Sequence, residues 1–126
     1  MPASQTIDLM SAYIDAINAE DLPRLEGVLA PNVVLREAPH RVHFPGNVIA
    51  RLRAERAAFP DLHMEVENLF ADEDGGHGAL VVLWTGRRLK ARICMLFEVV
   101  DNRIAAIELY GGLMKVLYDV GLLNVA

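Results

Sequence analysis

Residues 57–67 read Ala57-Ala58-Phe59-Pro60-Asp61-Leu62-His63-Met64-Glu65-Val66-Glu67, and here the chain changes from a helical to an extended pattern. Asn47 can cap a helix that runs to about Phe59, where Pro60 stops it. From His63 to Phe70, Met64 and Val66 alternate with acidic residues, which is typical of a half-buried strand. The stretch therefore predicts helices before it and strands after it.

Two further helices and one short strand are predicted upstream. Apolar residues recur at helical spacing between Ser4 and Asn18, and Asp21 can cap a second short helix with Pro23 in its first turn. Residues 33–37 are β-branched and apolar between two prolines, which indicates a short strand followed by a loop.

Four segments downstream predict an antiparallel meander, with turn residues between them. They are residues 63–70, 79–85, 89–100 and 104–110. Leu113, Val116, Leu117 and Val120 suggest a terminal helical turn that ends near Gly121. This order predicts an α+β domain in which helices pack on one face of a curved sheet and leave an apolar cavity.

Composition limits the function classes. The 126 residues suit a single domain spanning 1–126, and 53% hydrophobic residues can fill a core. A net charge of -5 argues against nucleic acid as a partner. We expect a cytoplasmic protein without a membrane partner, because no signal peptide or long apolar run is present. Cys94 is the sole cysteine, which excludes an internal disulfide.

Two stretches resemble a known family. Residues 12–22, with Asn18, Asp21 and Leu22, followed by residues 29–37, are similar to the opening of ketosteroid isomerases and SnoaL-like polyketide cyclases. Residues 59–63, Phe-Pro-Asp-Leu-His, resemble a segment of SnoaL-like cyclases. The resemblance implies the cone-shaped fold of the nuclear transport factor 2-like superfamily: a curved antiparallel sheet wrapped around three N-terminal helices. Activity does not follow from this fold alone, because it hosts several chemistries.

The resemblance also implies functional positions. The isomerase base falls on Glu37, and the tyrosine that donates to the developing enolate falls on Tyr13. The second donor falls on Met95, which cannot donate, and the acid/base aspartate of the cyclases falls on Gly112. The chain therefore matches neither mechanism in full.

Each catalytic candidate also has a structural interpretation. Glu37 is either a desolvated base at the mouth of the cone or a strand-end carboxylate bonded to Arg36, Arg41 or water. Tyr13 is either an enolate donor or a core tyrosine. His40, which lies just beyond Glu37, is either an auxiliary acid or a loop histidine.

Apolar residues on single strand or helix faces are candidates to surround a hydrophobic ligand, and they are equally candidates for the core. They are Phe59, Val82, Trp84, Met95 and Ile107. No metal site and no cofactor are expected, because no histidine pair with a carboxylate has metal-ligand spacing.

The favoured hypothesis is a cofactor-independent isomerase or cyclase that enolises a hydrophobic, polyketide- or steroid-like carbonyl compound. Glu37 would remove the proton and Tyr13 would stabilise the enolate. The alternatives are a non-catalytic ligand-binding or assembly module and an epoxide hydrolase, which would need two carboxylates and an arginine. We also expect a homodimer formed through the exposed sheet face, which carries Val81, Leu83 and Cys94.

Overall fold

The computed structural model describes residues 3–37, 40–43, 45–87 and 89–111, and for residues 37, 40–43, 45–47, 89 and 111 it describes the backbone alone. Helix α1 (Ala3–Ala19) buries one face, on which Met10, Tyr13, Ile14 and Ile17 recur every three or four residues. This helix was predicted from the same periodicity and is confirmed.

Helix α2 (Leu22–Val28) starts at the predicted cap. The Asp21 side chain accepts a hydrogen bond from the backbone N–H of Arg24 at 3.2 Å. Pro23 occupies the first turn, where its missing N–H costs little. Glu20, with φ of 54°, makes the tight turn between α1 and α2.

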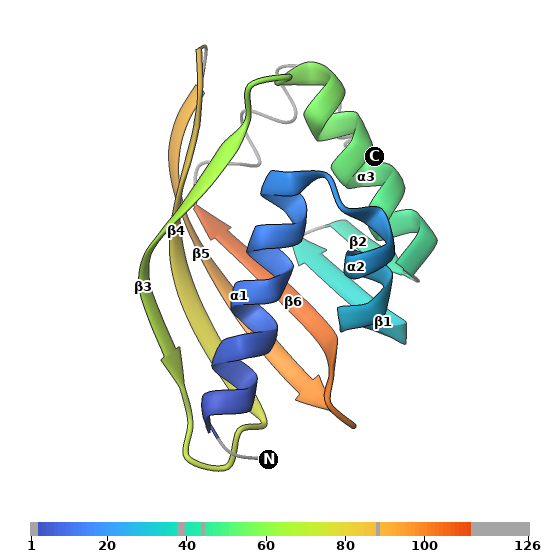
Figure 1. Cartoon of the computed structure of the whole chain (residues 1–126), viewed down its shortest axis with the longest axis vertical. Coiled ribbons are helices and arrows are strands. Elements are labelled where there is room, and N and C mark those ends of the chain that lie inside the picture. Colours follow the sequence, from blue (N-terminus) through green and yellow to red (C-terminus); the bar gives the residue numbers. More distant parts are fainter. Residues whose placement is uncertain (1–2, 38–39, 44, 88, 112–126) are drawn as a thin grey trace.

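Six strands form one sheet in the order β2-β1-β6-β5-β4-β3 (Figure 1). They are β1 (Leu29–Glu37), β2 (His40–His43), β3 (His63–Ala71), β4 (His77–Gly86), β5 (Leu89–Val100) and β6 (Arg103–Gly111). The neighbours from β3 to β6 pair antiparallel, so the predicted meander is confirmed. Asp101 and Asn102, with φ of 51° and 60°, form the two-residue turn between β5 and β6.

The structure corrects three details of the prediction. The first strand begins at Leu29 rather than Val33. The segment expected to be a loop after Glu37 contains β2, which pairs antiparallel with β1. Strand β1 lies parallel to β6, so the sheet is not wholly antiparallel. A parallel pair needs a long crossover connection, and β2, α3 and β3 to β5 lie between β1 and β6 in the sequence, so no local turn signal marks this pairing.

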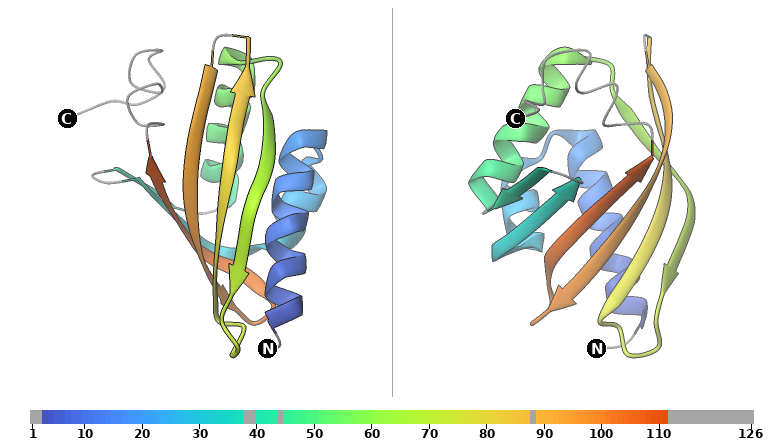
Figure 2. Two further views of the ribbon diagram at one scale, coloured as in Figure 1. Left: turned by 90° about the vertical axis from the view of Figure 1, so that its left-hand side faces the viewer. Right: turned by 180° about the vertical axis from the view of Figure 1, so that it is seen from behind.

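Helix α3 (Pro45–Ala58) ends just before Phe59 and Pro60, close to its predicted bounds. All three helices lie on one side of the curved sheet (Figures 1 and 2). None of the helices in the described part of the chain is long and apolar enough to cross a membrane.

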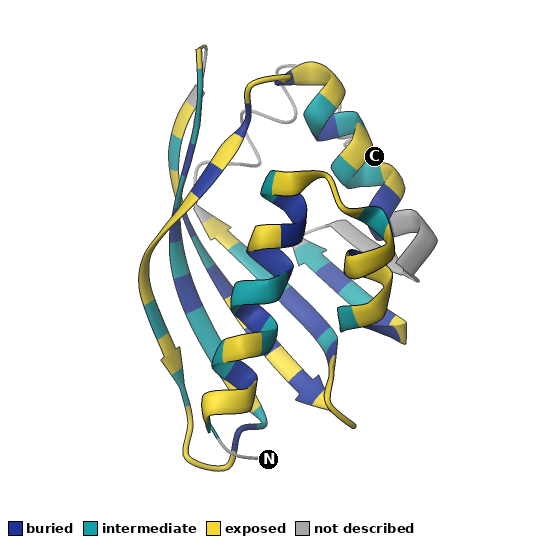
Figure 3. Cartoon of the chain, in the orientation of Figure 1, coloured by how far each residue is buried: buried dark blue, intermediate teal, exposed yellow. Residues whose placement is uncertain are grey.

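The core lies between α1 and the concave face of the sheet, as the buried residues in Figure 3 show. Strands β4, β5 and β6 contribute alternate residues that are at most 3% exposed. They are Leu80, Val82, Trp84, Ile93, Met95, Phe97 and Ile107. The Tyr13 ring meets the Phe97 ring edge to face, with centroids 5.7 Å apart.

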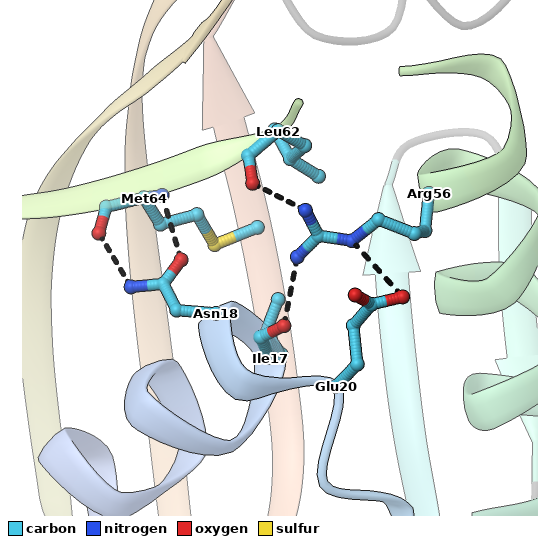
Figure 4. A network of polar contacts seen from close by, with 6 residues as sticks. All are labelled: Ile17, Asn18, Glu20, Arg56, Leu62 and Met64. Carbon is cyan, nitrogen blue, oxygen red and sulfur yellow. Dashed lines mark hydrogen bonds and ion pairs between the residues drawn. The ribbon is translucent and has the colours of Figure 1, made fainter. Parts of the chain in front are cut away.

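Asn18 fastens the end of α1 to the edge strand β3. Its side-chain amide donates to the backbone carbonyl of Met64 at 2.9 Å and accepts from the Met64 N–H at 2.8 Å (Figure 4). The amide thus pairs with the strand as another backbone would, and satisfies part of an exposed edge. The position of α1 relative to the start of β3 is fixed by this pair of hydrogen bonds.

Candidate active site

A buried ion pair lies on helix α3. Arg51 Nε and Glu55 Oε1 are 3.2 Å apart, one helical turn from each other, and the two side chains are 10% and 4% exposed. Charged side chains are rarely buried to this degree because desolvation costs several kcal/mol, as an order of magnitude, for each ion. A buried charged pair on an otherwise ordinary helix is therefore a candidate for function.

Arg51 and Glu55 share a small internal cavity with Tyr13 of α1. Its volume is about 10 Å³, close to the ~10–15 Å³ that one water molecule needs. The rest of its wall is apolar and comes from α3 and four strands: Leu35, Val48, Leu52, Met64, Met95 and Leu109. A carboxyl-bearing, a guanidinium-bearing and a phenol-bearing residue thus line one small space with mostly apolar walls.

Burial dominates the protonation of both acids. It raises the pKa of the Glu55 carboxyl above its usual 4.5, although the charge of Arg51 and its hydrogen bond oppose this effect. Burial also raises the pKa of the Tyr13 hydroxyl, the nearby Glu55 charge raises it further, and Arg51 lowers it. Burial therefore shifts both groups toward their neutral forms relative to the same groups in water.

A larger open space lies on the other side of Glu55. This space, which we call the helix groove, has a volume of about 470 Å³ and lies between the α1–α2 end of the molecule and α3. Glu20, Arg53 and Arg56 also line it. Its apolar wall includes Ile17, Leu22, Leu25, Leu52, Pro60 and Leu62. Glu55 and Leu52 line both the cavity and the helix groove.

Arg56 joins the two sides of the helix groove. Its guanidinium donates hydrogen bonds to the backbone carbonyls of Ile17, at 2.9 Å, and Leu62, and its Nε lies 3.8 Å from Glu20 Oε1 (Figure 4). The Ile17 carbonyl belongs to the last turn of α1, and it also accepts a hydrogen bond from the Glu20 N–H at 3.1 Å. Arg56 therefore holds α1, α3 and the segment before β3 in a fixed arrangement.

Two residues expected in the site from the sequence lie together. Tyr13 and Met95 both line the cavity, one from α1 and the other from β5. The remaining ligand-binding candidates, Phe59, Val82, Trp84 and Ile107, are buried in the core and do not line it. The Trp84 ring packs edge to face on Phe59 at 5.7 Å, and its Nε1 has no hydrogen-bond partner within the described part of the chain. Their contact with a ligand stays a prediction.

Three other candidates, Glu37, His40 and Gly112, lie partly or wholly outside the described residues. The backbone of Glu37 ends β1 and pairs with His40 of β2. The side chains of both residues, and the whole of Gly112, lie outside the described residues. Glu37 follows Leu35 of the cavity wall by two residues along β1. Its role as base and the auxiliary role of His40 stay predictions.

Metal binding finds no support among the residues that the structure describes. No group of three or more His, Cys, Asp or Glu side chains in this part of the chain could hold a metal ion. The expectation that the protein needs no metal and no cofactor stays a prediction.

Arg51 and Glu55 were missed in the sequence. The segment Arg51-Leu52-Arg53-Ala54-Glu55-Arg56 is so polar that it suggests a solvated helix face. The sequence nevertheless contained a pattern that indicates burial of Glu55. Val48, Leu52, Glu55 and Phe59 recur at helical spacing, so Glu55 occupies a position within an apolar stripe. A lone carboxylate at such a position indicates a buried acid.

Comparisons with known proteins agree with this fold. A candidate SnoaL-like polyketide cyclase from Jannaschia sp. CCS1 superposes with a TM-score of 0.82 at 16% identity, over 97% of this chain and 95% of that one. A candidate ketosteroid isomerase from Kribbella flavida DSM 17836 gives 0.77 at 20% identity, over 86% and 78%. An LEH-like epoxide hydrolase from M. tuberculosis gives 0.69 at 18% identity, over 94% and 90%.

At these identities the structural matches establish the fold alone. No curated protein matches the chain in sequence. The SnoaL-like domain, however, matches residues 10–107, which is most of the chain. The chain therefore belongs to the SnoaL-like domain family.

Proposed function

We propose that this protein catalyses acid/base enolisation of a small apolar carbonyl compound, leading to isomerisation or cyclisation. One observation carries the proposal: a buried carboxyl of raised pKa, Glu55, shares an apolar cavity with the buried phenol of Tyr13. Neutral donors in a water-free site stabilise a developing enolate strongly, because they need no reorganisation as the charge forms.

Glu55 supplies the donor that the sequence lacked. Family resemblance places the second enolate donor at Met95, which has no hydrogen to donate, but Met95 and Glu55 line the same cavity. Arg51 Nε bonds one oxygen of Glu55, Oε1, and the carboxyl proton can then be held by the other oxygen. In the proposed site, Tyr13 and Glu55 both donate to the enolate oxygen.

A substrate needs more room than the cavity now offers. Met64 and Met95 form part of its wall, and methionine side chains change rotamer readily to fit irregular ligands. Leu52 lines both the cavity and the helix groove and is only partly buried. We expect these side chains to move when ligand binds.

Glu37 is the proposed base. We expect Glu37→Gln to slow proton exchange at a ketone α-carbon by about a hundredfold or more, because an amide cannot accept the carbon-bound proton. Exchange is measured by loss of the α-proton NMR signal in deuterated water. The matched control is Glu65→Gln, at an exposed position of β3. Equal exchange rates for Glu37→Gln and wild type would contradict the role of Glu37.

Epoxide hydrolysis is a second candidate, favoured by the Arg51–Glu55 pair. Such a reaction needs an arginine between two carboxylates, and the pair supplies the arginine and one of them. Leu35 of the cavity wall precedes Glu37, the other candidate carboxylate, by two residues on β1. The epoxide hydrolase among the structural relatives shares the fold.

One substrate panel separates the candidate functions. Cyclic ketones and 1,3-diketones report enolisation through deuterium exchange, and small cyclic epoxides report hydrolysis through diol formation. Exchange without diol formation supports the primary proposal, and diol formation without exchange supports the second. A shift in melting temperature with a ligand that is neither exchanged nor hydrolysed would favour the binding module.

We also propose a homodimer formed through the convex sheet face. That face exposes Phe70, Leu96 and Tyr110 at 62%, 40% and 53%, which is a large apolar area to leave in water. Two ion pairs, Arg92–Glu67 and Arg36–Glu108, lie beside these residues. Light scattering at micromolar concentration should give the mass of two chains, and Leu96→Glu should give that of one. A wild-type monomer would contradict the proposal.

The cytoplasmic location stays a prediction.

A further inference from the structure

The helix groove has the size and lining of a ligand site. Its volume of about 470 Å³ falls within the ~300–1,000 Å³ of typical small-molecule pockets. The wall facing a ligand is mostly apolar, and the charged groups of Glu20 and Arg53 lie on exposed residues. The internal cavity, at about 10 Å³, could not hold the same ligand without rearrangement.

Glu55 gives the helix groove one buried polar group. The residue is 3% exposed, yet it lines the helix groove as well as the cavity. A ligand lying against Leu22, Leu52 and Ala57 would have Glu55 on one side, and the other charged residues of the lining, Glu20, Arg53 and Arg56, are less buried than Glu55. Such a lining favours an apolar molecule with a polar atom at the Glu55 end, because a polar group placed against the apolar wall would lose its water without gaining a partner.

The walls are held in place before any ligand binds. Arg56 bonds the carbonyls of Ile17 and Leu62, which both line the helix groove, and Asn18 bonds Met64, two residues after Leu62. Sites that need little ordering bind more tightly, because less conformational entropy is lost on association. These contacts, shown in Figure 4, make the helix groove a preformed site.

We propose that the helix groove binds the apolar body of a cyclic ketone, with the ketone oxygen accepting a hydrogen bond from Glu55. The choice of a ketone rests on the proposed function. The substrate then lies on the groove side of Glu55. The carbon frame of the ligand lies between α2 and α3, and Glu55 connects it to Tyr13 and the cavity.

The test uses 2-tetralone as the probe and two substitutions on one helix. Ala57 and Ala50 are both exposed residues of α3, but of the two only Ala57 lines the helix groove. Ala57→Trp fills the groove, and Ala50→Trp adds the same bulk elsewhere. Binding is measured by titration of backbone amide NMR signals, which also show where the probe lies.

We expect 2-tetralone to shift the amide signals of Leu22, Leu52 and Ala57, and to bind wild type and Ala50→Trp equally. Ala57→Trp should weaken binding at least about tenfold by occupying the site. Tetralin, which lacks the oxygen, should bind wild type about fivefold to tenfold more weakly than 2-tetralone, as expected for one lost hydrogen bond. Equal binding of tetralin and 2-tetralone would overturn the contact with Glu55.

Measuring both binding and α-proton exchange distinguishes a wrong groove site from a wrong catalytic function. Undiminished binding and undiminished α-proton exchange in Ala57→Trp would overturn the groove site and leave the enolisation proposal standing. If Ala57→Trp abolishes 2-tetralone binding and the wild type does not exchange α-protons, the groove site is supported and the enolisation proposal is contradicted. Absence of 2-tetralone binding to wild type would overturn the groove site.

Discussion

Glu55→Met is expected to slow α-proton exchange by about a hundredfold to a thousandfold, the usual cost of losing one preorganised donor from an enolate site. The effect is large because the Glu55 carboxyl is almost fully buried, and burial raises its pKa, which shifts it toward the protonated form that can donate. Methionine has a similar length and no donor, so the change opens no large cavity, but it removes the partner of Arg51, and the fold of the variant is therefore checked by circular dichroism first. The measurement is the exchange rate in deuterated water.

A second Glu55 variant and a control variant test the cause of this loss. Glu55→Gln keeps an N–H donor, so it should lose clearly less activity than Glu55→Met if Glu55 stabilises the enolate by donation. Glu26→Met, at an exposed position of α2, should exchange at the wild-type rate. Equal losses in Glu55→Gln and Glu55→Met would mean that Glu55 transfers a proton rather than donating a hydrogen bond. No loss in either variant would contradict the site.

Arg51→Met is expected to destabilise the fold by about 1 to 3 kcal/mol, because it leaves Oε1 of the buried Glu55 carboxyl without the hydrogen bond that Arg51 Nε donates. Arg51 and Glu55 are 3.2 Å apart, and both side chains are at most 10% exposed, so solvent screens the pair weakly. The free energy of unfolding is measured by urea denaturation. Arg53→Met, on the exposed side of the same helix, should change it by less than about 0.5 kcal/mol.

The double variant tests the cause of that loss. Replacing both members of a buried ion pair by apolar residues is often neutral or stabilising, by up to about 4 kcal/mol. Arg51→Met combined with Glu55→Met should therefore recover most of the stability lost in Arg51→Met. A double variant as unstable as the single one would show that Arg51 stabilises the fold through contacts other than Glu55.

Much of the fold could be predicted because its signals are local. The apolar periodicity of α1, the Asp21 cap and the alternation along the meander each depend on residues near one another in sequence. Strand β2 and the parallel pairing of β1 with β6 could not be predicted in the same way. Both depend on which distant segments meet in the sheet, and a short strand such as His40–His43 carries little pattern.

The site was predicted only in part, for a related reason. Tyr13 and Met95 were found by resemblance to known enzymes, and they do line one cavity. Arg51 and Glu55 were missed because their segment carries three arginines and a glutamate within six residues, which resembles a solvated surface. Tertiary packing of α3 buries this charge beside α1 and β1, and helical periodicity shows only that Glu55 shares a face with Val48 and Leu52.

The central claim is that Glu55 is a buried acid that remains protonated above the usual range of a carboxyl group. Titration of the side-chain carboxyl carbons by ¹³C NMR tests it most directly, with the Glu55 signal identified by its loss in Glu55→Gln. We predict a midpoint above the usual 4.5, since burial outweighs the opposing charge of Arg51. The exchange rate should then fall as pH rises through that midpoint, because the carboxyl loses its donated proton. A midpoint at or below 4.5 would contradict the account.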